Sequence, residues 1–349
     1  MLRRPGPRSR LLAELAQIER LVLLGDVVEL RRIPWRAAIA AARPVLSEIG
    51  RTLGPGKQVV IVPGNHDHHL LSGWSARRDH GEAPQPMTLQ TEVDWRAEEP
   101  LAEVVAALAP AEVRAYHPGV WLRDDVYATH GHLGDRHTTL PMLERLAAGA
   151  MARVVGEPAG GPRRVEDYEA TLAPIYAWIH AVAQAGGSER DRVPASASTS
   201  AWQALAGAGE SRARRRWRRR VLAAGFPLLI AGLNRAGLGP LRSELSGGEL
   251  GRASLRALWE VMGRLGVDAD YVIFGHTHRA GPLSQARAAN WRGPQGRMAI
   301  NTGSWILEPA FLGPRPESSP YRAGFCVLVD EAGPPELRNL LDPAGPAPG

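Results

Sequence analysis

Short apolar segments that each end in polar residues are the feature of this chain that most constrains its fold. The segments are Leu21–Leu24, Val59–Val62, Val126–Ala128, Tyr271–Phe274 and Met298–Ile300. Their length and their content of branched and aromatic residues are typical of buried β-strands. Because helical patterns separate several of them, the order of elements predicts an α/β fold.

The helical patterns have recognisable ends. Ser9 is the expected N-cap of a helix over residues 11–18, and a second helix is expected over Trp35–Leu53, interrupted by Pro44 and stopped by Gly54. Leucine and methionine recur at helical spacing up to Leu265, which predicts a third helix there.

Residues 138–267 differ from the rest of the chain. They carry helical patterns, such as 166–185, and Pro/Gly/Ser-rich stretches, with no convincing strand. We therefore expect a single domain over residues 1–340 with a helical insertion or cap at 138–267, packed near the site and governing substrate access. The Pro/Gly/Ala-rich tail, 341–349, is expected to be disordered.

Metal-ligating residue types follow the predicted strands directly. They are Asp26, Asn65, His66, Asp67, His130, His276 and His278. The carboxyl edge of an open α/β sheet is where ligands bind, so we expect these side chains to converge there. Carboxylate, amide oxygen and imidazole together suit Mn, Fe or Zn.

These segments resemble motifs of the calcineurin-like metallophosphoesterases. The similar segments are Gly25-Asp26, Gly64-Asn65-His66-Asp67, His130 within Thr129-His130-Gly131-His132, and Gly275-His276-Thr277-His278, followed by Asn301-Thr302-Gly303-Ser304. The resemblance covers about residues 10–135 and 268–330. It implies a four-layer α/β/β/α sandwich of two mixed sheets, and metal-dependent hydrolysis of a phosphomonoester, phosphodiester or pyrophosphate.

The resemblance also implies a role for each residue. Two divalent ions would be bridged by Asp26; Asn65, His130 and His276 would complete one ion's ligands, and His278 would bind the other. His66 would protonate the leaving group or stabilise the transition state, held by Asp67. Asn65 is also a candidate contact to the substrate phosphate. Arg279 is a second candidate because it directly follows the His276-Thr277-His278 motif, and this role is not part of the resemblance.

The family's first motif, Asp-x-His, does not occur in residues 1–8. We expect a start assigned too far downstream or a truncation, since every later ligand is intact. The alternative is real loss, which would leave a degenerate, inactive protein acting as a binding module.

Charge and composition leave the partners open. The formal charge is +6, almost entirely from arginine, and it reflects either compositional drift or attraction to an anionic partner such as nucleic acid. Arg212–Arg220 beside the apolar Val221–Leu233 is a candidate contact to an anionic membrane surface or nucleic acid, with a solvated helix as the simpler interpretation. A metal-dependent nuclease is therefore the alternative enzyme.

The cellular compartment is predicted from cysteine content and hydropathy. One cysteine, Cys326, excludes an internal disulfide, and there is neither a secretory signal nor an apolar run near the roughly 20 residues needed to span a bilayer. These features predict a cytoplasmic protein, with a peripheral membrane location as the alternative.

Overall fold

The computed structural model describes residues 1–79, 85–138, 143–185, 235, 247–283, 288–307, 309–312 and 315–342. The chain divides into two compact units. The core unit comprises Met1–Leu30, Pro34–His132 and Gly266–Gly349, and the helical unit comprises Arg31–Ile33 and Leu133–Leu265. Arg212–Arg220, the apolar run after it and residues 343–349 of the predicted tail lie outside the described residues.

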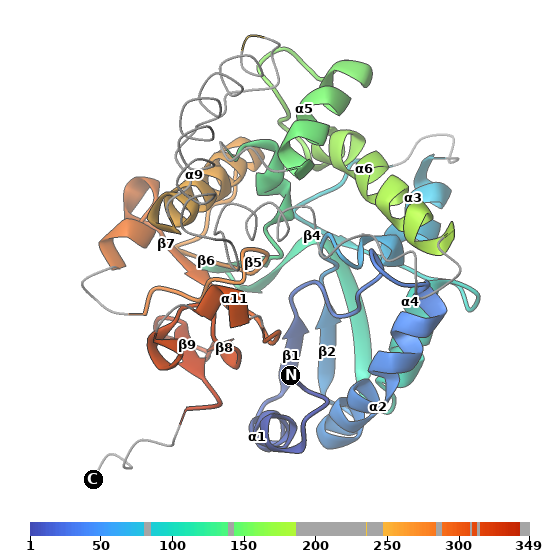
Figure 1. Ribbon diagram of the computed structural model, residues 1–349, viewed down its shortest axis with the longest axis vertical. Coiled ribbons are helices and arrows are strands. Elements are labelled where there is room, and N and C mark those ends of the chain that lie inside the picture. Colours follow the sequence, from blue (N-terminus) through green and yellow to red (C-terminus); the bar gives the residue numbers. More distant parts are fainter. Residues whose placement is uncertain are drawn as a thin grey trace, which may run out of the picture. The chain divides into compact units, whose positions relative to one another are not determined.

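A seven-stranded mixed sheet forms the centre of the core unit, in the order β1-β2-β4-β5-β6-β7, with β3 added to β4 (Figure 1). Its strands are β1 (Arg20–Leu23), β2 (Gln58–Ile61), β3 (Gln90–Glu92), β4 (Glu112–Arg123), β5 (Val126–Thr129), β6 (Tyr271–Phe274) and β7 (Met298–Asn301). The expected strands are thus present, and the predicted α/β class is confirmed. A separate antiparallel pair, β8 (Phe325–Leu328) and β9 (Glu336–Asn339), follows.

β4 was not predicted, yet it determines how the strand ends meet. Its first half pairs in parallel with β2, and its second half pairs antiparallel with β5. The carboxyl end of β2 lies opposite Ala115 and that of β5 lies opposite Gly119. The carboxyl ends of the two strand groups therefore approach each other head to head at the middle of β4, rather than sharing one edge of a parallel sheet.

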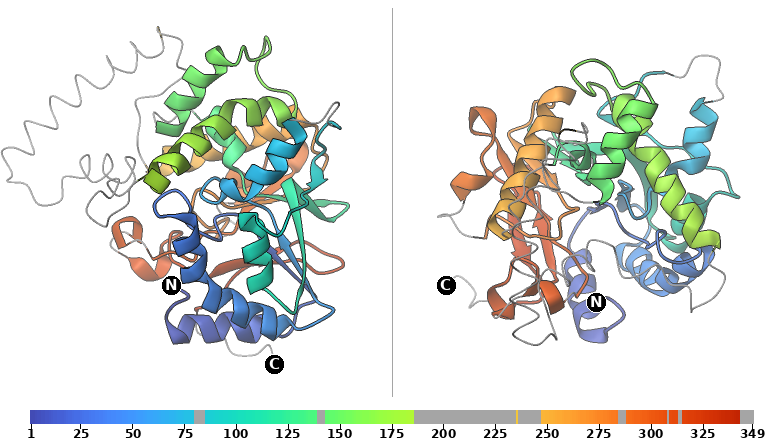
Figure 2. Two further views of the ribbon diagram at one scale, coloured as in Figure 1. Left: turned by 90° about the vertical axis from the view of Figure 1, so that its right-hand side faces the viewer. Right: turned by 45° about the horizontal axis from the view of Figure 1, so that its top comes forward.

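Helices cover one face of the sheet. They are α1 (Pro5–Leu15), α2 (Trp35–Leu53), α3 (Ser72–Asp79) and α4 (Pro100–Ala107) (Figures 1 and 2). Val59 and Ile61 of β2 pack with Ile39 of α2 in the core on this face. The alternate residues of β2 point to the other face, as the two-residue period of a strand requires.

The opposite face carries a second apolar core. Val60 and Val62 pack there with Ile273 and Ile300, and Val327 of β8 and Leu337 of β9 pack against the same cluster. The β8–β9 pair therefore packs against this face of the main sheet.

The helical unit contains α5 (Leu143–Val154), α6 (Val165–Ala185) and α9 (Gly247–Leu265). α6 buries Tyr168, Leu172 and Tyr176, while α9 buries Leu258 and its apolar neighbours. No strand is assigned to the described residues of this unit. How the unit relates to substrate access remains a prediction.

Two details of the helix predictions differ from the structure. The first helix begins at Pro5, with no side-chain cap, so Ser9 lies inside it rather than at its N-cap. Proline suits the first turn because its missing N–H would have no helical partner there. The second helix has the predicted bounds and retains Pro44 in its interior. Among the described residues, no helix combines the length and apolar character that crossing a membrane requires.

Candidate metal centre

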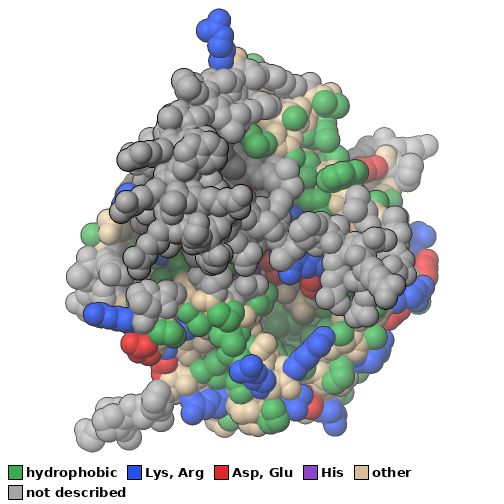
Figure 3. All heavy atoms as spheres, viewed as in Figure 1, with side chains coloured by type: hydrophobic (Ala, Val, Ile, Leu, Met, Phe, Trp, Pro, Cys, Tyr) green, Lys and Arg blue, Asp and Glu red, His purple; other side chains and the backbone are tan. Residues whose placement is uncertain are grey.

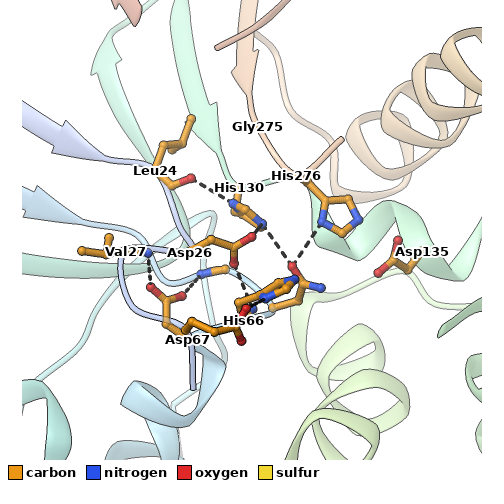
Figure 4. A network of polar contacts seen from close by, with 12 residues as sticks. Leu24, Asp26, Val27, His66, Asp67, His130, Asp135, Gly275 and His276 are labelled. Atoms are coloured by element: carbon orange, nitrogen blue, oxygen red, sulfur yellow. Dashed lines mark hydrogen bonds and ion pairs between the residues drawn. The ribbon is translucent and has the colours of Figure 1, made fainter. Parts of the chain in front are cut away.

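Four predicted ligands from four separate strand ends meet in the core unit. They are Asp26 after β1, Asn65 after β2, His130 after β5 and His276 after β6, and together they are called the Asn65 cluster. The side-chain oxygen Oδ1 of Asn65 lies 3.3 Å from Nε2 of His130 and 3.2 Å from Nδ1 of His276. Oδ2 of Asp26 lies 3.4 Å from Nε2 of His130. Figure 4 shows the two imidazoles directed at the same amide oxygen.

These separations fit ligand atoms around a single ion. Ligand atoms bound at about 2.1 Å lie about 3.0 Å apart at right angles and about 3.4 Å apart at the tetrahedral angle. The spacings of 3.2–3.4 Å in the Asn65 cluster fall in that interval. The donor set, two imidazoles with a carboxylate and an amide oxygen, is one that Mn, Fe or Zn accepts.

A backbone hydrogen bond fixes the orientation of the His130 ring. Its Nδ1 donates to the carbonyl of Leu24, at 2.9 Å, so Nε2 is the nitrogen that faces Asp26 and Asn65. A hydrogen bond of this kind fixes the tautomer of a metal-binding histidine.

Electrostatics at His130 indicate a position suited to a cation. Burial alone lowers the pKa of His130, but the Asp26 carboxylate overrides it and raises that pKa to about 9. Burial likewise raises the pKa of Asp26, but the charge of His130 and its hydrogen bond hold it well below the usual range. A proton on Nε2 thus bridges two oxygens, and a metal ion can take the place of that proton.

The charges of the Asn65 cluster act on His278, but the His278 side chain makes no hydrogen bond or ion pair with that cluster. Burial lowers its pKa to about 4, and the charges acting on it include that of Asp26. The ring is therefore neutral near pH 7 and carries a lone pair, as a metal ligand must. It forms no hydrogen bond or ion pair with the other described residues, so the structure brings four of the five predicted ligands into direct contact.

Backbone strain marks the same loops. Asp26, His276 and His278 have φ values of 55°, 63° and 58°. Each residue other than glycine in this left-handed region costs about 1–2 kcal/mol. Three of the five predicted ligands are held in this conformation, which is typical of functional sites whose surroundings fix the backbone.

Two glycines make room for the cluster. A Cβ on Gly25 would lie 2.1 Å from Nδ1 of His130. A Cβ on Gly64 would lie 2.5 Å from Oδ1 of Asp26 and 2.7 Å from Nε2 of His130. Only glycine lets the ligand side chains approach the backbone this closely.

The predicted pairing of His66 with Asp67 is not what the structure contains. Nδ1 of His66 donates to Oε2 of Glu29 at 2.8 Å. Asp67 is buried and accepts the backbone N–H groups of Gly64 and Val27, both at 2.7 Å. Asp67 therefore joins the loops after β1 and β2, while Glu29 orients the His66 ring.

The pKa of Asp67 is shifted, although its hydrogen bonds are made only to backbone N–H groups. Burial, and then the negative charge of Asp26, raise the pKa of Asp67 to about 6. The two backbone N–H donors oppose that shift. These two hydrogen bonds stabilise the charged carboxylate of Asp67 beside Asp26, and they connect the loop after β1 to the loop after β2.

Sequence reasoning gave Glu29 only a local role and gave Asn301 none. The signal for Glu29 was its position three residues after Asp26. The same loop contacts His66 through a hydrogen bond from the Leu30 N–H to the His66 carbonyl. Asn301 is the last residue of β7 and is fully buried. Its Nδ2 donates to the Gly275 carbonyl at 2.8 Å and to Oγ1 of Thr277 at 2.9 Å, and its Oδ1 accepts Gly303 N–H at 2.8 Å.

We expect Asn301→Asp to lower the melting temperature by about 2–8 °C. The substitution keeps the shape but replaces the amide donor that faces the Gly275 carbonyl, and an unsatisfied buried group costs about 1–3 kcal/mol. Calorimetric melting measures the effect. Asn290→Asp, at an exposed position, is the matched control and should leave the melting temperature within about 1 °C. Equal melting temperatures for both variants would mean that Asn301 does not hold the His276–His278 loop.

Arg279, the predicted substrate residue, directly follows His278 in the chain. Its guanidinium carbon is 5.6 Å from the ring centroid of Trp291, in a cation–π arrangement. It forms no hydrogen bond or ion pair with another described residue.

Comparison with models of known protein families, with curated protein sequences and with solved structures yields no match.

Proposed function

We propose that this protein is a metal-dependent phosphoesterase of the calcineurin-like type, which hydrolyses a phosphomonoester, phosphodiester or pyrophosphate bond. The observation that carries the proposal is the convergence of Asp26, His130 and His276 on Asn65. These residues come from four strand ends widely separated in sequence, and their contacts have the spacing and chemistry of a metal's ligand set.

Asp26, Asn65, His130 and His276 would hold the first divalent ion. Asp26 and His278 would contribute to a second, since His278 carries a neutral ring within range of the Asp26 charge. Bound divalent ions supply Lewis-acid polarisation of the phosphoryl group and lower the pKa of water. The ligand pattern favours manganese, iron or zinc for both positions.

His66 is the proposed proton donor to the leaving group. Its Nδ1 proton is committed to Glu29, so a second proton on the protonated ring resides on Nε2 and can be transferred. His66 and Glu29 are about one third exposed, at 31% and 35% of their side chains, so substrate can approach the ring. Asp67 supports this arrangement only through the backbone.

The finer fold assignment is part of the same proposal. A four-layer α/β/β/α sandwich requires two packed sheets with helices outside. The packing of Val327 and Leu337 against the main sheet supports the second sheet layer, and the α1, α2 and α4 face supports one outer helical layer.

The nuclease alternative depends on a basic groove for nucleic acid. On the face seen in Figure 3, the described arginine and lysine side chains lie mainly over the lower part, interspersed with apolar and acidic ones, and this arrangement does not by itself favour nucleic acid. Arg212–Arg220 remains a proposal for an anionic membrane or nucleic-acid contact. We therefore retain the simpler phosphate-ester substrate.

The proposed activity is tested by metal-dependent hydrolysis. The full natural chain, including any in-frame residues upstream of Met1, is stripped with EDTA and reconstituted with Mn²⁺; it is then expected to hydrolyse bis-p-nitrophenyl phosphate or p-nitrophenyl phosphate. Asp26→Asn is expected to lower kcat/KM at least about 100-fold, because it weakens the charge that holds the ion. Asp330→Asn, at an exposed aspartate, is the matched control.

Hydrolysis that is equally fast in EDTA, or in Asp26→Asn, would overturn the proposal. Calorimetric titration with Mn²⁺ distinguishes the phosphoesterase from a degenerate, inactive binding module. Tight binding of Mn²⁺ that depends on Asp26, without hydrolysis of either substrate, would support a degenerate module that binds metal without catalysis.

A further inference from the structure

Arg279 presents a positive charge for which the described part of the chain offers no carboxylate. It follows His278 directly, so its Cα lies about 3.8 Å from that of a proposed metal ligand. The guanidinium rests over Trp291, which is only 4% exposed. A Cβ on Gly281 would lie 2.1 Å from the Trp291 ring, so the indole is fixed against the backbone beneath it.

Tyr321 lies on the same side of this loop. The N–H of Ala280 donates to the carbonyl of Pro320 at 2.8 Å, which places Arg279 and Tyr321 each one residue from a shared backbone hydrogen bond. Burial raises the pKa of the Tyr321 hydroxyl, and the charge of Arg279 opposes that rise. The hydroxyl is therefore protonated near pH 7, and no hydrogen bond to another described residue uses it.

Arg279 belongs to the loop that carries His276 and His278, and among the described residues no hydrogen bond or ion pair joins it to the Asn65 cluster. The positive charges that act most on the Asp26 carboxylate are those of His130 and His66, whereas Arg279 acts on Tyr321. A guanidinium held on an indole face is pre-organised and presents its N–H groups in a planar fork that matches phosphate oxygens. Because Arg279 follows His278 directly, an anion bound by Arg279 would lie next to a phosphoryl group held at the Asn65 cluster.

We propose that Arg279 and Tyr321 form a subsite for a second phosphate, so that the substrate contains two adjacent phosphates joined as a pyrophosphate diester. This inference rests on the proposed function and narrows its substrate class. Arg279 would thus bind the neighbouring phosphate, while the residues of the Asn65 cluster serve the phosphate that reacts. A substrate with a single phosphate leaves the subsite without a ligand.

The test compares two probes, ADP-ribose with two adjacent phosphates and the methyl ester of adenosine monophosphate with one. Calorimetry on Mn²⁺-loaded protein is expected to give at least about tenfold tighter binding of ADP-ribose, since hydrogen bonds to charged groups are the stronger kind. Arg279→Ala should remove that preference and leave binding of the methyl ester within about threefold. Arg279→Lys should restore only part of it, because an ammonium group lacks the planar fork.

Arg292→Ala is the matched control, because Arg292 adjoins Trp291 in sequence but donates to the Gly296 carbonyl. Tyr321→Phe should lose a smaller part of the preference. The same titrations on metal-free protein provide a measurement independent of activity, and ADP-ribose binding there should also weaken in Arg279→Ala.

Unchanged selectivity in Arg279→Ala, with metal-dependent hydrolysis intact, would overturn the subsite alone. Absence of both metal binding and hydrolysis in the unaltered chain would instead overturn the proposed function.

Discussion

Gly64→Ala is expected to lower the affinity for Mn²⁺ at least about 100-fold without changing any side chain of the Asn65 cluster. The added Cβ would lie 2.5 Å from Oδ1 of Asp26 and 2.7 Å from Nε2 of His130, closer than carbon can approach either atom. One ligand must therefore move. Displacing even the groups that support metal ligands costs 10–100-fold in affinity, and here a ligand itself is displaced.

Calorimetric titration with Mn²⁺ measures this effect. Gly263→Ala is the matched control, because a Cβ there meets no atom within 4 Å. Circular dichroism checks that Gly64→Ala remains folded. A folded Gly64→Ala variant with unchanged Mn²⁺ affinity would mean that the ion does not bind between Asp26 and His130.

His66→Ala is expected to lower kcat by about 100- to 1,000-fold, with little change in Mn²⁺ affinity. General acid catalysis contributes roughly 10²–10⁴ in rate, and a nitrophenolate leaving group needs less of it than an alkoxide. The alanine retains the backbone N–H that donates to Asp26 at 2.9 Å, so the ligand position is preserved. The measurement is steady-state kinetics with a p-nitrophenyl ester and with a methyl ester.

The loss should be larger for the methyl ester, which has the poorer leaving group. Glu29→Gln should give a smaller loss of about tenfold, because the amide still contacts Nδ1 but no longer stabilises the protonated ring. His69→Ala, at a neighbouring histidine outside the proposed machinery, serves as the control. Equal losses for both leaving groups would contradict the role of His66 as proton donor.

The strand ends were predictable because their signals are local. A short apolar segment followed by glycine and a metal-ligating residue defines a strand and its exit, and Leu23, Ile61 and Phe274 end strands within one residue of the predicted ends. The convergence of Asp26, Asn65, His130 and His276 followed from the position of their strand ends. How the two groups of strand ends meet, however, depends on β4, which was not predicted.

β4 was missed because its sequence contradicts the usual signals. It contains His117 and Pro118 and carries charged residues near both ends, whereas a central strand normally excludes proline. Pro118 lies where β4 changes partners, since β3 pairs with residues 116–118 of β4 and β5 pairs from Gly119 onward. Only tertiary pairing reveals that arrangement.

The partner of His66 was also beyond local reasoning. Adjacent residues such as His66 and Asp67 suggest a pair, but the backbone directs Asp67 into the protein toward Gly64 and Val27 N–H. Glu29 reaches His66 from another loop, 37 residues earlier in the chain. The left-handed conformations of Asp26, His276 and His278 likewise depend on packing, because none of these residues is glycine.

The central claim is that Asn65 Oδ1 and the imidazoles beside it bind a divalent ion that the phosphoesterase reaction requires. Anomalous diffraction from a crystal grown with Mn²⁺ tests it most directly. A peak within about 2.3 Å of Asn65 Oδ1, His130 Nε2 and His276 Nδ1 is the predicted result. A crystal that shows ordered Mn²⁺ elsewhere, or no peak at this cluster at saturating Mn²⁺, would contradict it.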